Sequence, residues 1–288
     1  PNPYDGEPIY NLGLALKYQG RYNDAYDRFY KSCWNAAWQD AGYFACAQIS
    51  ILQNRLEDAL DEIDRSLIRN WHNHKARALK TAILRRMDKT EEALQLIEDS
   101  LAIDKFNFGC RYEKYLITNV VDELAVMKEM MRGEPHNYDE IALDYCAAGC
   151  WQEAASLWNI AIAEGIVTPM TYYYLGWCLH QGGLPGVKQA FDDAVKACPD
   201  YCFPNRLEAI LALQCAMEQN PDDARAPYYL GNLYYDKRQY DLAMKAWETS
   251  ARLDDSFPTV WRNLALVFFN KKNEEAKAIE CMERAFCL

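Results

Sequence analysis

Residues 56–69 read LEDALDEIDRSLIR, and residues 90–103, which lie 34 positions further on, read TEEALQLIEDSLAI. Alanine, isoleucine and serine occupy matching places in the two stretches. Residues 22–34 show the same order, with Phe29 in the place of isoleucine. In each stretch apolar residues recur every three or four positions, which is the spacing of one face of an α-helix. A fixed period carried through three segments predicts a repeat architecture.

A second helix is expected before each of these stretches, at Pro8–Gln19, Ala41–Gln53 and Lys75–Arg86. Tight turns such as Gln19–Arg21 would join the two helices, so the repeating unit is a pair of antiparallel helices. Helices are also expected further along the chain at Arg111–Asn119, Val121–Arg132, Tyr138–Ala147, Trp151–Ala163, Pro169–Gln181 and Pro204–Gln219. The predicted fold class is therefore all-α, an α-solenoid with one continuous core between stacked helix pairs.

The pattern resembles the tetratricopeptide repeat (TPR) family, whose unit of 34 residues keeps Leu-Gly, Tyr, Ala and Phe at set positions. Two parts of the chain carry the resemblance best, namely Leu12-Gly13 with Gly20, Tyr22, Ala25 and Phe29, and Leu230-Gly231 with Tyr234, Tyr240 and Ala243. The resemblance implies a right-handed superhelix of about eight repeats, some of them divergent. It also implies a concave groove that is lined by the first helix of each pair and binds a protein or peptide segment.

Departures from the repeat suggest three groups of helices. Residues 1–107 hold three regular repeats, residues 108–203 a divergent repeat followed by two TPR-like repeats, and residues 204–288 a single helix followed by two repeats. In the third repeat, Arg77 and Lys80 stand where the family keeps apolar residues, so the register there is left open.

A narrower resemblance concerns the C-terminal part, from Ala226–Asn232 to Trp261–Leu264. This part is similar to the helical tail of certain large bacterial proteins that carry an N-terminal mutarotase-like β-sandwich. The resemblance implies an alternative function, in which the chain is the helical part of a carbohydrate-active protein and packs on its glycan site or contributes to it. Because the sequence starts without Met, we expect it to be a segment of a longer polypeptide.

Charge and cysteine content exclude some classes of function. The formal net charge is −11, and residues 108–223 hold 17 acidic against 7 basic side chains. Nucleic acid is therefore not the expected partner, because phosphate binding relies on clustered Lys and Arg. The 11 cysteines include Cys46, Cys178 and Cys215 within apolar helical stretches, which is typical of buried free thiols in a reduced, cytoplasmic setting. The longest uncharged run, Gly165–Val187, contains Pro, Gln and several Gly, and is not expected to span a membrane.

The family register places aromatic and polar residues along the inner groove, where they would suit a peptide or a sugar ring. The predicted ligand-binding residues are Tyr10, Phe44, Tyr173, Trp177, His180, Tyr228, Asn232 and Arg262. The alternative left open is that these aromatic rings pack between repeats. Tyr172 falls on a position that the family packs inside, so it is expected in the core.

Sites of other kinds are not expected. Asn232 and Asn263 match two positions of the family's carboxylate clamp, but Tyr228 stands in place of its lysine, so a complete clamp is not expected. The His and Cys residues lack the paired spacing of a structural zinc module, and no phosphate loop, dinucleotide glycine pattern or nucleophile motif is present. We therefore expect no metal and no cofactor. The predicted function is a non-catalytic scaffold that binds a protein or peptide segment, or another domain of its own polypeptide.

Overall fold

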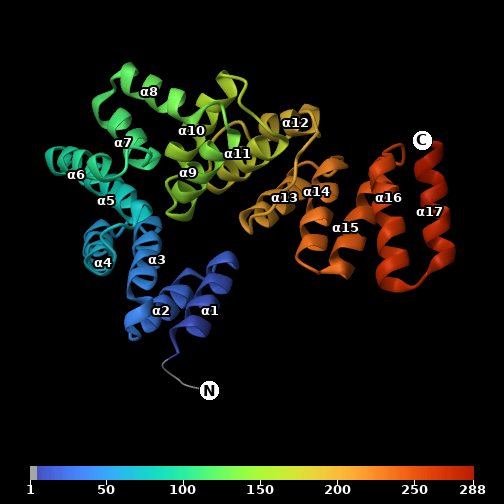
Figure 1. Ribbon diagram of the computed structural model, residues 1–288, viewed down its shortest axis with the longest axis horizontal. Coiled ribbons are helices and arrows are strands. Elements are labelled where there is room, and N and C mark those ends of the chain that lie inside the picture. Colours follow the sequence, from blue (N-terminus) through green and yellow to red (C-terminus); the bar gives the residue numbers. More distant parts are fainter. Residues whose placement is uncertain (1–4) are drawn as a thin grey trace. The chain divides into compact units, whose positions relative to one another are not determined.

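The computed structural model describes residues 5–288 (Figure 1). The chain forms two compact units, and the boundary between them in the sequence lies between Ala154 and Ala155. Within residues 5–288 the regular structure is entirely helical, with 17 α-helices, a 3₁₀ turn at Ala36–Trp38 and a π-helical turn at Phe268–Lys272. None of these helices is long and apolar enough to cross a membrane. The all-α prediction is confirmed.

Unit 1 consists of nine helices and the start of a tenth. They are α1 (Gly6–Tyr18), α2 (Tyr22–Ser32), α3 (Gln39–Leu52), α4 (Leu56–Arg69), α5 (His74–Arg86), α6 (Thr90–Ile103), α7 (Phe108–Thr118), α8 (Val121–Met131), α9 (Pro135–Ala147) and the first residues of α10 (Trp151–Ala163). Each odd-numbered helix from α1 to α7 packs against the helix that follows it, and α2, α4 and α6 also contact the first helix of the next pair. This is the stacking that the 34-residue period predicts.

The turns inside the first three pairs preserve the same period. Gly20, Asn54 and Asp88 lie 34 positions apart and have positive φ angles of 73°, 58° and 58°. Glycine adopts this left-handed conformation without a steric penalty, and Asn and Asp tolerate it better than other residues do. The chain can therefore reverse direction within a few residues and bring the second helix against the first.

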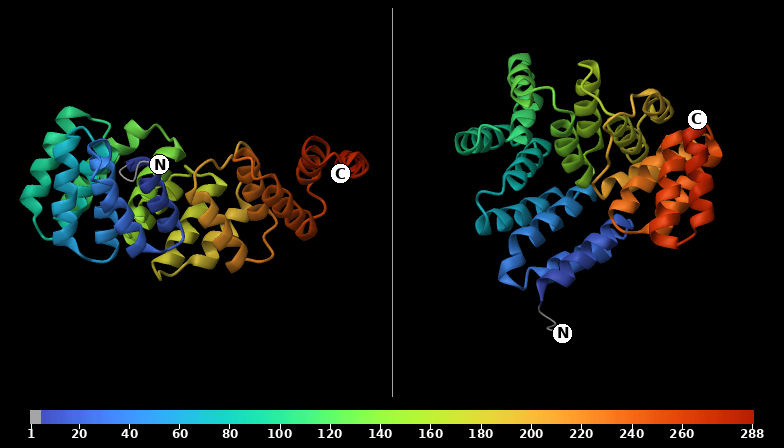
Figure 2. Two further views of the ribbon diagram at one scale, coloured as in Figure 1. Left: turned by 90° about the horizontal axis from the view of Figure 1, so that it is seen from below. Right: turned by 45° about the vertical axis from the view of Figure 1, so that its right-hand side comes forward.

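Unit 2 holds the rest of α10 and seven further helices. They are α11 (Pro169–Gln181), α12 (Val187–Lys196), α13 (Glu208–Gln219), α14 (Arg225–Asp236), α15 (Tyr240–Leu253), α16 (Pro258–Val267) and α17 (Glu275–Cys287). The last four lie side by side as two antiparallel pairs (Figure 2). The helix predicted at Pro204–Gln219 is α13, which packs against α11 and α14 and has only a small contact with α12. The chain is thus an α-solenoid of helix pairs interrupted by one single helix. The right-handed superhelix and the three groups of repeats stay predictions.

Close approach within the pairs depends on small residues in the first helix. A Cβ atom added at Gly231 would lie 2.4 Å from the indole nitrogen of Trp247, and one at Gly176 would lie 2.4 Å from the ring of Phe191. Ala243, on the second helix of the Gly231 pair, is also fully buried. An ordinary side chain at either glycine would push the two helices apart.

Arg77 is fully buried, at the core position that the repeat register assigns to it. Its Nε donates to Ser100 Oγ over 2.8 Å, and its guanidinium carbon lies 4.3 Å from the centre of the Trp71 ring. The cation is therefore held by an aromatic face and a hydroxyl group. The register of the third repeat is thus the regular one, with an unusual residue inside it.

Candidate functional site

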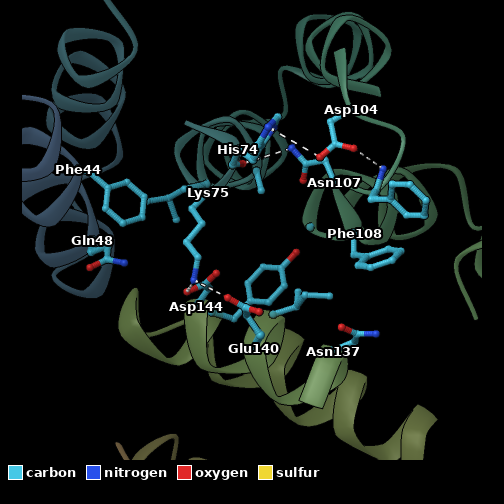
Figure 3. Close-up of a pocket in the computed structure, with 16 residues that line it drawn as sticks. Phe44, Gln48, His74, Lys75, Asp104, Asn107, Phe108, Asn137, Glu140 and Asp144 are labelled. Carbon is cyan, nitrogen blue, oxygen red and sulfur yellow. Dashed lines mark hydrogen bonds and ion pairs between the residues drawn. The ribbon is translucent and has the colours of Figure 1, made fainter. Parts of the chain in front are cut away.

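A cavity of about 220 Å³ lies in unit 1 between α3, α5, α7 and α9 (Figure 3). These are first helices of successive pairs, and the turn between α6 and α7 completes the wall. The repeat pattern explains this placement, since stacking turns the same face of each first helix toward the same side of the unit. The cavity therefore lies where a TPR-like groove is expected.

The walls of the cavity are mainly apolar. The apolar and aromatic lining residues are Phe44, Ala78, Leu79, Phe106, Phe108, Ile141 and Tyr145. Leu79, Ile141 and Tyr145 are buried, whereas Phe44 and Phe108 are half-buried and Phe106 is exposed at the edge. A surface of this composition favours an apolar or aromatic group over a strongly hydrated one.

An ion-pair network holds Tyr145 in place. The hydroxyl group of Tyr145 donates to Glu113 Oε1 over 2.6 Å. Glu113 is fully buried and also accepts from Arg85 Nε over 2.6 Å, while Arg85 reaches Glu153 over 2.9 Å. Burial, followed by the negative charge of Glu113, raises the pKa of Tyr145, so that the phenol stays protonated as a donor. The cavity wall at Tyr145 is therefore rigidly positioned.

Charged groups surround the opening. Lys75 extends from α5 toward α9, where its ammonium group lies 2.9 Å from Asp144 and 3.3 Å from Glu140 (Figure 3). Burial alone would lower the pKa of Lys75, but the attraction of Asp144 and Glu140 outweighs it and leaves the pKa raised. On the opposite side, His74 Nε2 lies 3.7 Å from Asp104. Three carboxylates, those of Asp104, Glu140 and Asp144, therefore line the opening together with one ammonium group and the imidazole of His74.

Helix caps fix the side of the cavity where α5 and α7 begin. Asn73 caps α5 by accepting from the backbone of Ala76, and Asn107 caps α7 by accepting from Cys110. The amide of Asn107 also donates to the backbone oxygen of His74 over 3.3 Å and so ties the start of α7 to the start of α5. These contacts hold the turn that carries Phe106 against α5.

The cavity can bind a group. Among residues 5–288, no group of three or more His, Cys, Asp or Glu side chains is arranged to hold a metal ion. Cys46, Cys178 and Cys215 are buried and form no disulfide, as the sequence predicts. Burial raises the pKa of the Cys110 thiol, next to the cavity, to about 12, so it stays protonated. An apolar cavity with a charged opening is typical of a recognition site.

The structure contradicts the expected exposure of two predicted site residues. Tyr173 is fully buried and its hydroxyl group donates to Asp223 over 2.8 Å, and Trp177 is only 8% exposed. Tyr172, which the family register places in the core, is half-buried, whereas His180 is exposed. The helix carries no charged residue that could set its rotation from sequence, which explains why the register is wrong there. Tyr173 and Trp177 are core residues.

The other predicted site residues lie in different surroundings. In unit 1, Phe44 lines the cavity, while Tyr10 packs against Phe29 and does not line it. In unit 2, Asn232 accepts from the indole of Trp247 and from Asn263, so its amide oxygen serves the fold.

Tyr228 and Arg262 also lie in unit 2. The ring of Tyr228 packs against Phe257 with a centroid distance of 4.8 Å, and Arg262 is exposed and donates to Asn263. The structure thus connects Asn232 and Arg262 through Asn263. A binding role for any of these residues stays a prediction.

Sequence reasoning missed most of the cavity. The residues it did not select include His74, Lys75, Asp104, Asn107, Glu140, Asp144, Phe106, Phe108 and Tyr145. One available signal was the aromatic pair Phe106 and Phe108, at the junction between the third repeat and the helix that follows it. A second was the acidic excess of residues 108–223, to which Glu140 and Asp144 belong.

Comparison with known proteins supports the repeat class. Residues 205–258 and 228–285 match the family model described as tetratricopeptide repeat. The match covers α13 to α17 and agrees with the resemblance seen around Leu230-Gly231. The similarity to bacterial proteins with a mutarotase-like domain stays a prediction.

Several solved structures resemble the chain. YrrB, described as a TPR protein with an unusual peptide-binding site, is 16% identical with a TM-score of 0.28, covering 78% of this chain and 91% of its own. A tetratricopeptide repeat protein from Parabacteroides merdae is 12% identical with a TM-score of 0.37, over 99% of this chain and 86% of its own. Yeast Tom70 is 14% identical with a TM-score of 0.31, and the match covers 97% of this chain and 68% of Tom70.

Proposed function

We propose that the chain is a non-catalytic scaffold that binds a segment of a partner protein in the unit 1 cavity. The observation that carries the proposal is the cavity itself, with apolar walls, a charged opening and a wall fixed by the network of Glu113 and Arg85. Its volume of about 220 Å³ is below the roughly 300–1,000 Å³ of pockets that enclose a drug-sized molecule. The cavity therefore suits one side chain of a longer segment that continues across the surface.

Peptide selection against the full chain tests this proposal. Peptides recovered from a random display library would be labelled and titrated against the chain and two variants. Phe106→Ala removes an exposed ring at the cavity edge, and Phe203→Ala removes a still more exposed ring in unit 2. We expect Phe106→Ala to weaken binding by roughly tenfold and Phe203→Ala to leave it unchanged, because truncating an aromatic anchor typically costs more than about 1 kcal/mol.

Either of two results would contradict the proposal. One is that selected peptides bind Phe106→Ala and the unchanged chain equally well. The other is that no peptide is selected while a glycan array gives saturable binding, which would favour the carbohydrate-linked alternative. Helix content from circular dichroism should be the same for both variants, because both rings are largely exposed.

A further inference from the structure

We infer that the unit 1 cavity selects a segment in which an apolar side chain stands next to lysine or arginine. This inference rests on the proposed function and adds the chemistry of the partner. The apolar walls would take the apolar side chain, and the carboxylates at the opening would take the cation.

The charges at the opening are unequal. Asp104 lies on the side of α5 and α7, and Glu140 and Asp144 lie on α9 (Figure 3). Lys75 is the one ammonium group among the lining residues of the cavity. The nearby Lys105 places its ammonium group over the ring of Phe106, 5.2 Å from its centre, and does not line the cavity. Lys17 also lies nearby, with its ammonium group bonded to the lining residue Gln48 over 2.7 Å. The charged side chains that line the cavity are thus three carboxylates and one ammonium group, and this excess of negative charge complements a cationic segment.

Lys75 shows how a cation can be held at this place. Its ammonium group lies within 3.3 Å of the carboxylates of Glu140 and Asp144, which both belong to α9. The side chains of Lys75, Glu140 and Asp144 are 46%, 49% and 38% exposed, so the contact is open to water. Exposed ion pairs of this kind contribute little stability, and a cation of a partner can exchange with Lys75 at low cost.

Lys75 therefore acts as a competitor built into the chain. When a partner brings its own Lys or Arg to Glu140 and Asp144, the flexible Lys75 side chain can turn to solvent. Removing the Lys75 charge should then improve binding of a basic segment. If the cavity instead selected acidic segments, Lys75 would be their anchor and its removal would abolish binding. The two alternatives predict opposite signs for one substitution.

The experiment uses the full chain and three fluorescein-labelled peptides that differ only in charge. They are Gly-Ser-Arg-Phe-Arg-Ser-Gly, the same peptide with Glu for Arg, and the same peptide with Gln for Arg. Fluorescence polarisation at low salt should rank the Arg peptide first, by about three- to tenfold over the Gln peptide, and the Glu peptide last. The difference should shrink as salt screens the charges.

Variants locate the effect at the opening. For the Arg peptide, Asp144→Asn and Glu140→Gln should each weaken binding by about three- to tenfold, and Lys75→Met should strengthen it by a similar factor. Asp24→Asn, which removes an exposed carboxylate paired with Arg21 on α2, should leave binding unchanged and serves as the matched control.

The outcomes separate the inference from the proposal beneath it. Equal affinity for the three peptides, a preference for Glu, or weaker binding by Lys75→Met would overturn the charge selection while leaving a peptide site in place. If none of the peptides binds, and library selection also yields none that depends on Phe106, the proposed function fails and the inference fails with it.

Discussion

Phe44 in unit 1 and Tyr173 in unit 2 are both aromatic residues on the first helix of a pair, and the family register assigns both to a groove. Phe44 is half-buried at the wall of a cavity, whereas Tyr173 is fully buried. The difference comes from the helices that succeed each residue along the chain. Tyr173 lies against Tyr229 of α14 and bonds to Asp223 in the turn after the single helix α13. The helices that follow a repeat therefore decide whether an aromatic residue at this position is buried in the core or lies at the surface.

The two units also differ in their polar networks, because unit 1 has an ion-pair network and unit 2 has a single buried carboxylate. Beside the unit 1 cavity, Arg85 pairs with Glu113 and Glu153. In unit 2, Asp223 accepts from Tyr173 and from the start of α14, and burial raises its pKa despite these bonds. Glu113 is fully buried, and removing one partner of an ion pair that includes a buried charge is strongly destabilising. The cavity wall is thus more sensitive to single substitutions than the covered aromatic residues of unit 2.

The largest effect is expected from Glu113→Ala, which removes the centre of the unit 1 network. Arg85 would keep only Glu153, and the hydroxyl group of Tyr145 would lose its acceptor. We expect unit 1 to lose about 3–5 kcal/mol of unfolding free energy. Hydrogen exchange should show faster exchange in α7 and α9 and little change in α14–α17. Glu129→Ala, at an exposed site on α8, is the control, and equal effects of the two variants would contradict this interpretation.

Glycine substitutions compare the tightness of one pair in each unit. Gly231→Ala places a Cβ 2.4 Å from Trp247, whose indole bonds to Tyr228 and Asn232, and Gly13→Ala places one 2.7 Å from the ring of Phe29. Each should cost about 1–3 kcal/mol through overpacking. Because each pair contacts mainly its neighbours, the faster hydrogen exchange should stay in the unit that carries the substitution. Loss of protection in both units from one substitution would show that they unfold together.

The helix pairs themselves could be predicted from sequence. The boundaries expected for the first six helices agree with the structure within two residues, and α10 and α11 agree at both ends. These ends follow from local chemistry, since the helical spacing of apolar residues and the Gly, Asn and Asp turns act within a few positions. The cavity could not be predicted in the same way, because its lining comes from five elements spread from Phe44 to Tyr145.

A smaller effect is expected from Tyr173→Phe, which removes one bond to the buried Asp223. Unit 2 should lose about 1–2 kcal/mol, because a buried acceptor is left with fewer donors. Tyr172→Phe, on the neighbouring half-buried residue, should change stability by less than about 0.5 kcal/mol. Both costs can be measured from the hydrogen exchange of α11 in the full chain at increasing urea concentrations. A larger cost at Tyr172 than at Tyr173 would mean that α11 is rotated from the position described.

The smallest effect concerns pH and Glu62 in unit 1. Glu62 is buried, and burial raises its pKa above the usual 4.5 even though Tyr26 and Ser50 donate hydrogen bonds to it. The folded chain then binds more protons than the unfolded chain, so this group lowers stability as pH rises above about 4.5 through its folded pKa. A single group can change the unfolding free energy by at most about 1.4 kcal/mol per pH unit, and Glu62→Gln should remove the contribution of Glu62.

Hydrogen-exchange protection of α1–α4, measured between pH 4 and 7, would check this effect. Glu57→Gln, at an exposed position of the same helix, should keep the pH dependence of the unchanged chain. If Glu62→Gln also kept it, the dependence would arise from another group.

The sequence by itself determined the helix pairs, their turns and their order, because helical periodicity and the conformational preferences of Gly, Asn and Asp are properties of short segments. It left the register around Arg77 open, and only the structure shows that Arg77 is buried between the Trp71 ring and Ser100. The tertiary structure decided which aromatic residues are covered and which line a cavity. That decision depends on contacts between residues dozens of positions apart, such as Tyr173 with Asp223 and Lys75 with Asp144, and no local pattern encodes them.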